Sequence, residues 1–121
     1  MNALGNPPSL IRKPKMFKGH YKTGRITATG AAINVELGFV PETVHIRNLT
    51  SRDELFWDEG MTNGHGFKRV AAGTGTAITS GGISPYVGVL GTTGRGFTIG
   101  TDADINVNTE ILHYTAVLTD A

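Results

Sequence analysis

The chain contains no cysteine, which excludes disulfide bonds, thiolate zinc sites and cysteine nucleophiles together. It has no apolar run close to the roughly 20 residues that a transmembrane helix needs, so we expect no membrane span. The first eight residues include Gly5, Pro7 and Pro8 and lack the continuous apolar stretch of a secretory leader, so we expect no export signal. Charged residues make up only 17% of the chain, and no window carries the pattern of a long amphipathic helix.

Glycine, by contrast, is abundant, with 17 residues among 121, and it separates short segments rich in Val, Ile, Thr and Phe. This pattern is typical of an all-β domain with tight turns, and the length has room for one such domain. We expect about eight to ten short strands in an antiparallel β-sandwich or jelly roll. The predicted strands cover 17–21, 25–29, 32–37, 43–49, 67–72, 76–80, 86–90, 96–100, 105–107 and 111–118.

Charge is distributed unevenly along the chain. Residues 1–30 hold six basic side chains and no acidic one, whereas residues 31–121 hold five basic and ten acidic side chains. Three prolines before residue 15 oppose regular structure, so we predict an extended basic N-terminal arm over residues 1–15 and a single β-sandwich domain over residues 16–121. The candidate partner-binding residues of this N-terminal region are Leu10, Ile11, Arg12, Lys13, Lys15 and Lys18.

Several roles are open for this basic arm. It could be a frayed terminus, or it could become ordered on a partner, with Leu10 and Ile11 seated in an apolar groove. Clustered basic residues also bind nucleic acid, but the body is acidic and Phe17 and Tyr21 are too few for a stacking platform. We therefore favour an acidic protein surface over nucleic acid as the partner of the arm.

The polar side chains show no catalytic or metal-binding pattern. Oxygen-bearing residues alternate with apolar ones from Asp102 to Glu110, but a calcium loop would need glycine and glutamate where Val107 and His113 stand. We favour a strand or turn there over a cation site. The four histidines are far apart in sequence, and the acidic residues Asp53, Glu54, Asp58 and Glu59 give only weak support for a glycosidase. We expect no cofactor, no metal and no enzymatic activity.

Several short motifs together resemble the capsid decoration (cement) proteins of tailed bacteriophages, or closely similar small virion proteins. They run from Gly38 to the C-terminus: Gly38-Phe39-Val40-Pro41 with Val44, Ile46 and Asn48; Trp57-Asp58-Glu59-Gly60-Met61; Gly82-Ile83; Gly96 to Asp102; and Tyr114-Thr115-Ala116. The resemblance implies a β-sandwich made in the host cytoplasm that forms a dimer or trimer on the capsid exterior. It further implies that the domain binds the major capsid protein and locks neighbouring subunits together.

A phage tail or fibre module that binds carbohydrate is the main alternative. Trp57, Tyr86 and the turn Asn63-Gly64-His65 could form a platform for sugar rings. Phe56 and Trp57 could equally be an aromatic anchor of the core or of an interface, and for Trp57 we favour burial over a sugar platform.

Overall fold

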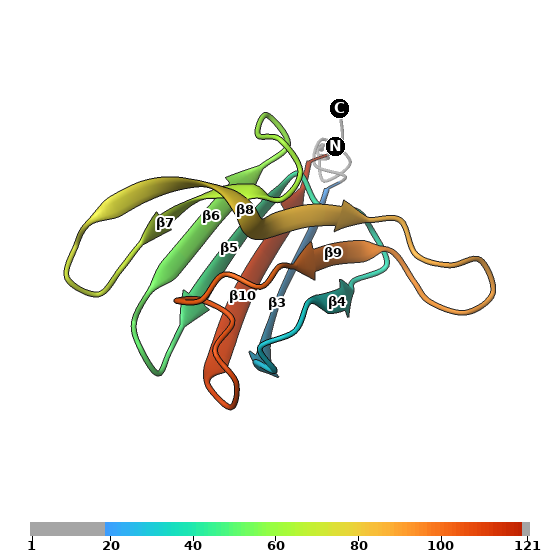
Figure 1. Ribbon diagram of the computed structural model, residues 1–121. Coiled ribbons are helices and arrows are strands. Elements are labelled where there is room, and N and C mark those ends of the chain that lie inside the picture. The colour runs from blue at the N-terminus through green and yellow to red at the C-terminus, as the bar shows by residue number, and fades with distance from the viewer. Residues whose placement is uncertain (1–18, 120–121) are drawn as a thin grey trace, which may run out of the picture.

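The computed structural model describes residues 19–119, which form eight strands. The predicted arm, with Leu10, Ile11, Arg12, Lys13 and Lys15, lies outside the described residues, as does Lys18. Because residues 19–119 contain no helix, none is present there with the length and apolar character of a membrane span. The strands are β3 (His20–Thr27), β4 (Ile33–Glu36), β5 (Thr43–Asn48), β6 (Glu54–Asp58), β7 (His65–Arg69), β8 (Gly75–Tyr86), β9 (Gly96–Ile99) and β10 (Ile111–Leu118) (Figure 1).

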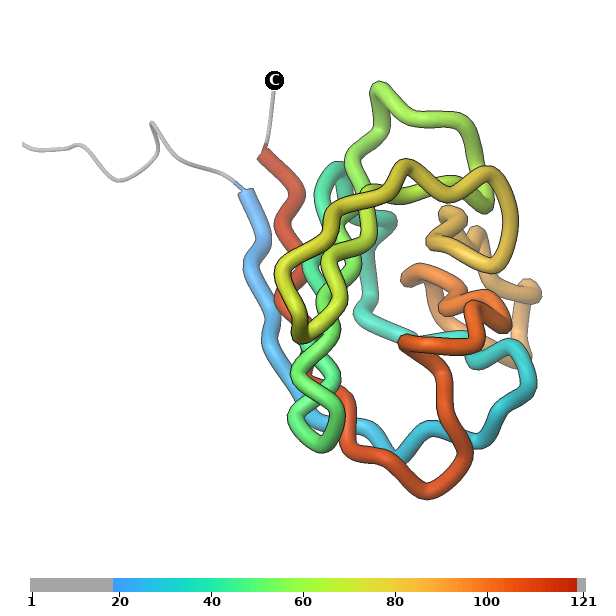
Figure 2. The backbone as a smooth tube through the Cα atoms, turned by 60° about the vertical axis from the view of Figure 1, so that its left-hand side comes forward, coloured from blue at the N-terminus to red at the C-terminus, as the bar shows by residue number. Residues whose placement is uncertain are grey.

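All eight strands belong to one sheet in the order β3-β10-β5-β6-β7-β8-β9-β4, and every neighbouring pair is antiparallel. The sheet curls, so that β9 and β4 lie across β10 and β3 (Figures 1 and 2). This arrangement confirms the prediction of an all-β, antiparallel fold. Within residues 19–119, β3 and β4 are the two edge strands of the sheet, and they follow one another in the chain.

The core lies on the concave side of the curled sheet. Every second side chain along a strand points to this side and so enters the core. Val44 and Ile46 of β5 are fully buried, as predicted from the alternation of that segment. Trp57 and Phe97 are the largest fully buried side chains, and the Trp57 indole N–H donates to the carbonyl of Thr62 at 3.3 Å. Trp57 is therefore a core residue, since only 1% of it is exposed.

The bend of the sheet is concentrated in β8. We predicted two strands separated by Gly81-Gly82, but one strand of 12 residues runs through both glycines. The register with β7 breaks here: His65 pairs with Ile83, while the next residue, Gly66, pairs with Ile78. Gly81 has a φ of +74°, and a Cβ on Gly82 would lie 2.0 Å from the carbonyl oxygen of His65. Glycine thus lets the strand bulge and turn instead of ending it.

The predicted strands at 86–90 and 105–107 are wrong. Residues 87–90 lie beyond the end of β8, in the loop that leads to β9. Residues 101–110 form a series of turns, although polar and apolar side chains alternate there as in a half-buried strand. The predicted strands at 17–21 and 25–29 correspond to the single strand β3. The segments 87–90 and 105–107 have a composition typical of strands, but neither joins the sheet formed by residues 19–119, and Val89 makes only an isolated bridge to Thr93.

Asn106 holds the 101–110 loop against the rest of the fold. Only 3% of this residue is exposed, yet its amide has four hydrogen-bond partners. The side-chain oxygen accepts from the backbone N–H groups of Thr29 at 3.3 Å and Gly30 at 3.0 Å. The side-chain nitrogen donates to the carbonyls of Ala31 at 2.7 Å and Gly100 at 2.9 Å. All the hydrogen-bonding capacity of this buried amide is therefore used.

Asn48, which is 1% exposed, has the same role at the other end of the loop. Its side-chain oxygen accepts from the backbone N–H groups of Thr50 and Ser51, both at 2.9 Å. Its nitrogen donates to the Ile105 carbonyl at 3.1 Å and to Oε1 of Glu110 at 2.7 Å. Asn48 therefore joins the turn after β5 to the 101–110 loop at two points, Ile105 and Glu110.

We predict that Asn106→Ala lowers the free energy of unfolding by about 3 kcal/mol, because four backbone groups, three in residues 29–31 and one at Gly100, lose the partner that this buried side chain provides. Urea unfolding, followed by tryptophan fluorescence, measures the change. Asn108→Ala is the matched control, since Asn108 is exposed in the same loop. Equal unfolding midpoints for the two variants would contradict the role assigned to Asn106.

Candidate functional site

The convex side of the sheet is a candidate binding surface, which we call the outer face. It consists of the residues of β3, β10, β5, β6 and β7 that point away from the core, and no other strand of the part of the chain that the structure describes lies over it (Figures 1 and 2). Residues that pair directly across antiparallel strands point to the same side, so the register fixes which side chains are neighbours. Two rows of this face carry side chains typical of binding surfaces.

The first row contains an aromatic pair. Phe56 of β6 pairs with Phe67 of β7, and the two residues are 40% and 42% exposed. The ring of Phe67 lies over Gly75, since a Cβ on this glycine would be only 2.6 Å from Cζ of the phenylalanine. On the other side of Phe56, His45 continues the row. The absence of a side chain at Gly75 thus leaves room for an aromatic ring to lie against the outer face.

The second row is basic. Arg25, His113, Arg47, Glu54 and Arg69 follow one another across five adjacent strands. With strands about 4.8 Å apart, the row spans roughly 19 Å. Its one carboxylate, on Glu54, contacts Nε2 of His45 at 2.9 Å. The three arginines are exposed and give this row an excess of positive charge.

The structure separates the two aromatic residues that the sequence placed together. Trp57 is buried on the core side, whereas Phe56 is exposed on the outer face, because consecutive residues of a strand point to opposite sides. Phe67 and the arginine row were not predicted as site residues. The alternation of His45 and Arg47 with buried residues was visible in the sequence, but alignment of the row across five strands requires the pairing register.

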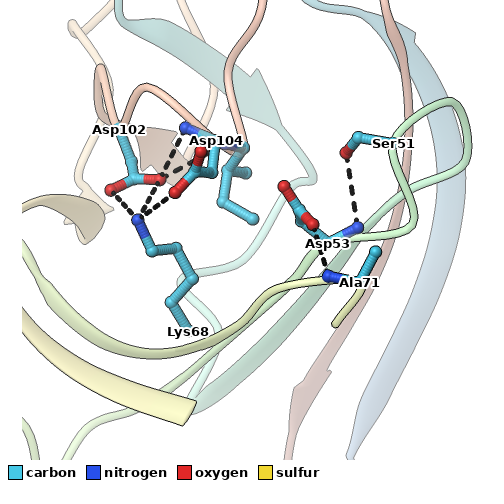
Figure 3. Close-up of polar contacts among 7 residues, drawn as sticks. Ser51, Asp53, Lys68, Ala71, Asp102 and Asp104 are labelled. Atoms are coloured by element: carbon cyan, nitrogen blue, oxygen red, sulfur yellow. Dashed lines mark hydrogen bonds and ion pairs between the residues drawn. The ribbon is translucent and has the colours of Figure 1, made fainter. Parts of the chain in front are cut away.

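The acidic residues considered as catalytic candidates are dispersed. The carboxylate of Asp53 is buried and accepts from the backbone N–H of Ala71 at 2.7 Å, which fixes the turn after β7 (Figure 3). Glu54 faces outward toward His45, and Asp58 accepts from the N–H of Gly60 at 2.8 Å. Among residues 19–119, no group of three or more His, Asp or Glu side chains is placed to hold a metal ion.

Asp102 and Asp104, two members of the polar run considered for a cation, bind a lysine instead (Figure 3). Nζ of Lys68 lies 3.0 Å from Asp102 Oδ1 and 2.7 Å from Asp104 Oδ2. The Lys68 side chain is 14% exposed and that of Asp102 is 10% exposed, so the pair is largely shielded from water. The hydrogen bond to Asp104 is the main cause that raises the pKa of Lys68 above its ordinary value of 10.5, and Asp102 adds to it.

We predict that Lys68→Met lowers the free energy of unfolding at neutral pH by about 1–3 kcal/mol, because the Asp102 carboxylate loses its cation in a shielded site. A raised lysine pKa gives stability that is complete below pH 10.5 and is lost as the pH rises through the higher pKa of the folded state. The gap between wild type and variant should therefore narrow above pH 10.5. Urea unfolding of both proteins over a pH series tests this, and a gap that widens at alkaline pH would contradict it.

The comparisons with known proteins leave the family of the chain open. No family model, no curated protein sequence and no solved structure matches it.

Proposed function

We propose that the chain is a structural virion protein of the capsid decoration (cement) class, which binds the capsid exterior and stabilises contacts between major capsid subunits. The observation that carries this proposal is the outer face, where the Phe56–Phe67 pair lies beside a row of exposed arginines. Aromatic residues and arginine are the side chains most enriched at protein interfaces. The motifs that resemble decoration proteins agree with this assignment, and so does an all-β, antiparallel sheet that curls around its core.

The size of the outer face explains why an additional contact would be needed. Five strands about 4.8 Å apart, with five to eight residues each, give a flat area of roughly 500 Å². A standard interface buries about 800 Å² on each partner, so the face alone would bind weakly. The arm over residues 1–15 precedes β3, which borders the outer face, and its basic residues could supply the rest of the contact. Many copies bound to one shell would then combine their weak contacts into a large total stabilisation of the shell.

We predict that Phe56→Ala weakens binding to shells about tenfold or more, because it removes an exposed aromatic contact from the outer face. The measurement is co-sedimentation of the purified protein with mature shells that lack it, with saturation at a fixed number of copies. Leu49→Ala is the matched control, since Leu49 is 42% exposed but lies in the turn after β5. Equal affinities for the two variants would contradict the assignment to the outer face.

Deletion of residues 1–15 should also weaken attachment and reduce its salt dependence, because it removes basic side chains that pair with acidic groups on the partner. The same co-sedimentation over a salt series measures both effects, and circular dichroism checks that the β domain remains folded. Unchanged binding of the truncated protein would exclude a role for the arm.

A carbohydrate-binding module of a phage tail or fibre is the second candidate, and the exposed Phe56–Phe67 pair is the observation that favours it. The platform expected from the sequence loses Trp57, which is buried, and Tyr86 is half-buried with its hydroxyl 2.7 Å from that of Thr93. Sugar rings would have to stack on the two phenylalanines instead. A glycan-array signal that Phe56→Ala abolishes, from a protein that does not bind shells, would support this function over the first.

A further inference from the structure

The loop between β8 and β9, residues 87–95, displays apolar side chains to solvent. Val87 is 75% exposed, Val89 is 53% exposed and Leu90 is fully exposed. These three residues, which we call the apolar tip, lie within four consecutive positions of a loop that projects beyond the rest of the molecule (Figure 1). Contiguous exposed apolar side chains on a small protein mark an interaction site.

The apolar tip is held in one conformation by its own loop. The N–H of Val89 donates to the hydroxyl of Thr93 at 2.8 Å, and the N–H of Thr93 donates to the Val89 carbonyl at 2.9 Å. Below this closed turn, the N–H of Gly94 donates to Glu36 on β4 at 2.8 Å. Gly88 has a φ of +80°, and a Cβ there would lie 2.7 Å from the Thr93 carbonyl oxygen. A loop ordered in this way loses little conformational freedom when it binds.

A hollow of about 320 Å³ lies elsewhere on the same chain, where β7 and β8 separate at the bulge. Met61, Phe67, Ala77 and Ile78 provide apolar surface in its lining, together with Thr79. At about 30 Å³ per water molecule, the hollow holds about ten waters, which is more room than the seven side-chain carbons of Leu90 and Val89 require. A second hollow, of about 190 Å³, is lined by charged side chains that include Arg47 and Arg52, so it does not suit an apolar tip.

The tip and the hollow of one molecule cannot meet. Ala77 in the hollow and Tyr86 at the base of the loop are nine positions apart on β8, a separation of roughly 25–30 Å at the rise of a strand. Charge favours a second copy as the occupant: Arg95 is exposed at the base of the loop, and Glu59 is exposed next in sequence to Gly60, which lines the hollow. We propose that the apolar tip of one copy inserts into the hollow of a second copy, with Leu90 as its central anchor.

This contact joins two different surfaces, so it links copies head to tail and closes into a ring when the rotation permits. It stands independently of the proposed capsid role, because both surfaces belong to this chain. Phe67 borders the hollow and also lies on the outer face, so substitutions at Phe67 would affect both sites. The test therefore uses Leu90 and Ala77, whose substitution leaves Phe56 and the arginine row in place.

The experiment measures the mass of the full chain in solution by sedimentation velocity over a concentration series. We expect the wild type to form oligomers and Leu90→Asp to weaken self-association at least tenfold. Leu49→Asp is the matched control, because it places the same charge at another exposed leucine. A monomeric wild type, or equal association of the Leu90 and Leu49 variants, would overturn the proposal.

A mixture of two variants tests the head-to-tail geometry. Leu90→Asp retains an intact hollow, and Ala77→Asp retains an intact tip, so each alone should be monomeric and an equimolar mixture should form dimers and nothing larger. Thr79→Asp replaces Ala77→Asp if circular dichroism shows that the latter does not fold. Because the chain has no cysteine, Leu90→Cys mixed with Ala77→Cys should also form a disulfide-linked heterodimer on oxidation. A mixture of folded variants that stays monomeric and does not cross-link would overturn the tip-to-hollow contact.

Discussion

Two buried side-chain amides connect the parts of this fold that the sheet itself does not join. Asn48 and Asn106 each make four hydrogen bonds, and between them they fix the 101–110 loop to the turn after β5, to the segment after β3 and to the end of β9. A buried amide with partners for every donor and acceptor specifies one arrangement, because any shift leaves polar groups unpaired. Asn106 in particular joins the segment after β3, at one edge of the curled sheet, to the end of β9, near the other edge.

The parts of the fold that follow from local alternation were predictable. Val44 and Ile46 are buried as their spacing indicates, and Leu112, Tyr114 and Ala116 of β10 alternate into the core in the same way. The errors occur where a tertiary contact overrides the local pattern. The residues around Asn106 alternate like a strand, but their polar side chains bond to distant backbone groups and so favour turns.

The candidate binding surfaces were harder to predict from the sequence, for a related reason. Phe56 was identified as an aromatic of the core or an interface, and its exposure follows once Trp57 is known to be buried. The arginine row depends on register across five strands, which no local pattern supplies. The apolar segment 87–90 fits a strand by composition, but in the structure it joins no strand of the sheet and turns back on itself through the Val89–Thr93 bridge, so its side chains face water.

The pairing of β3 with β10 determines how the domain would respond to mechanical force. His20 at the start of β3 pairs with Leu118 at the end of β10, so the two ends of the described chain lie side by side. A force that pulls these ends apart would break the hydrogen bonds between β3 and β10 one residue pair after another. At each moment only one pair would resist the force. A force applied between the apolar tip and the outer face would instead load several strands together. A partner that held the molecule only by its two chain ends would therefore peel β3 from the sheet, whereas contacts on the faces would keep the domain intact under tension.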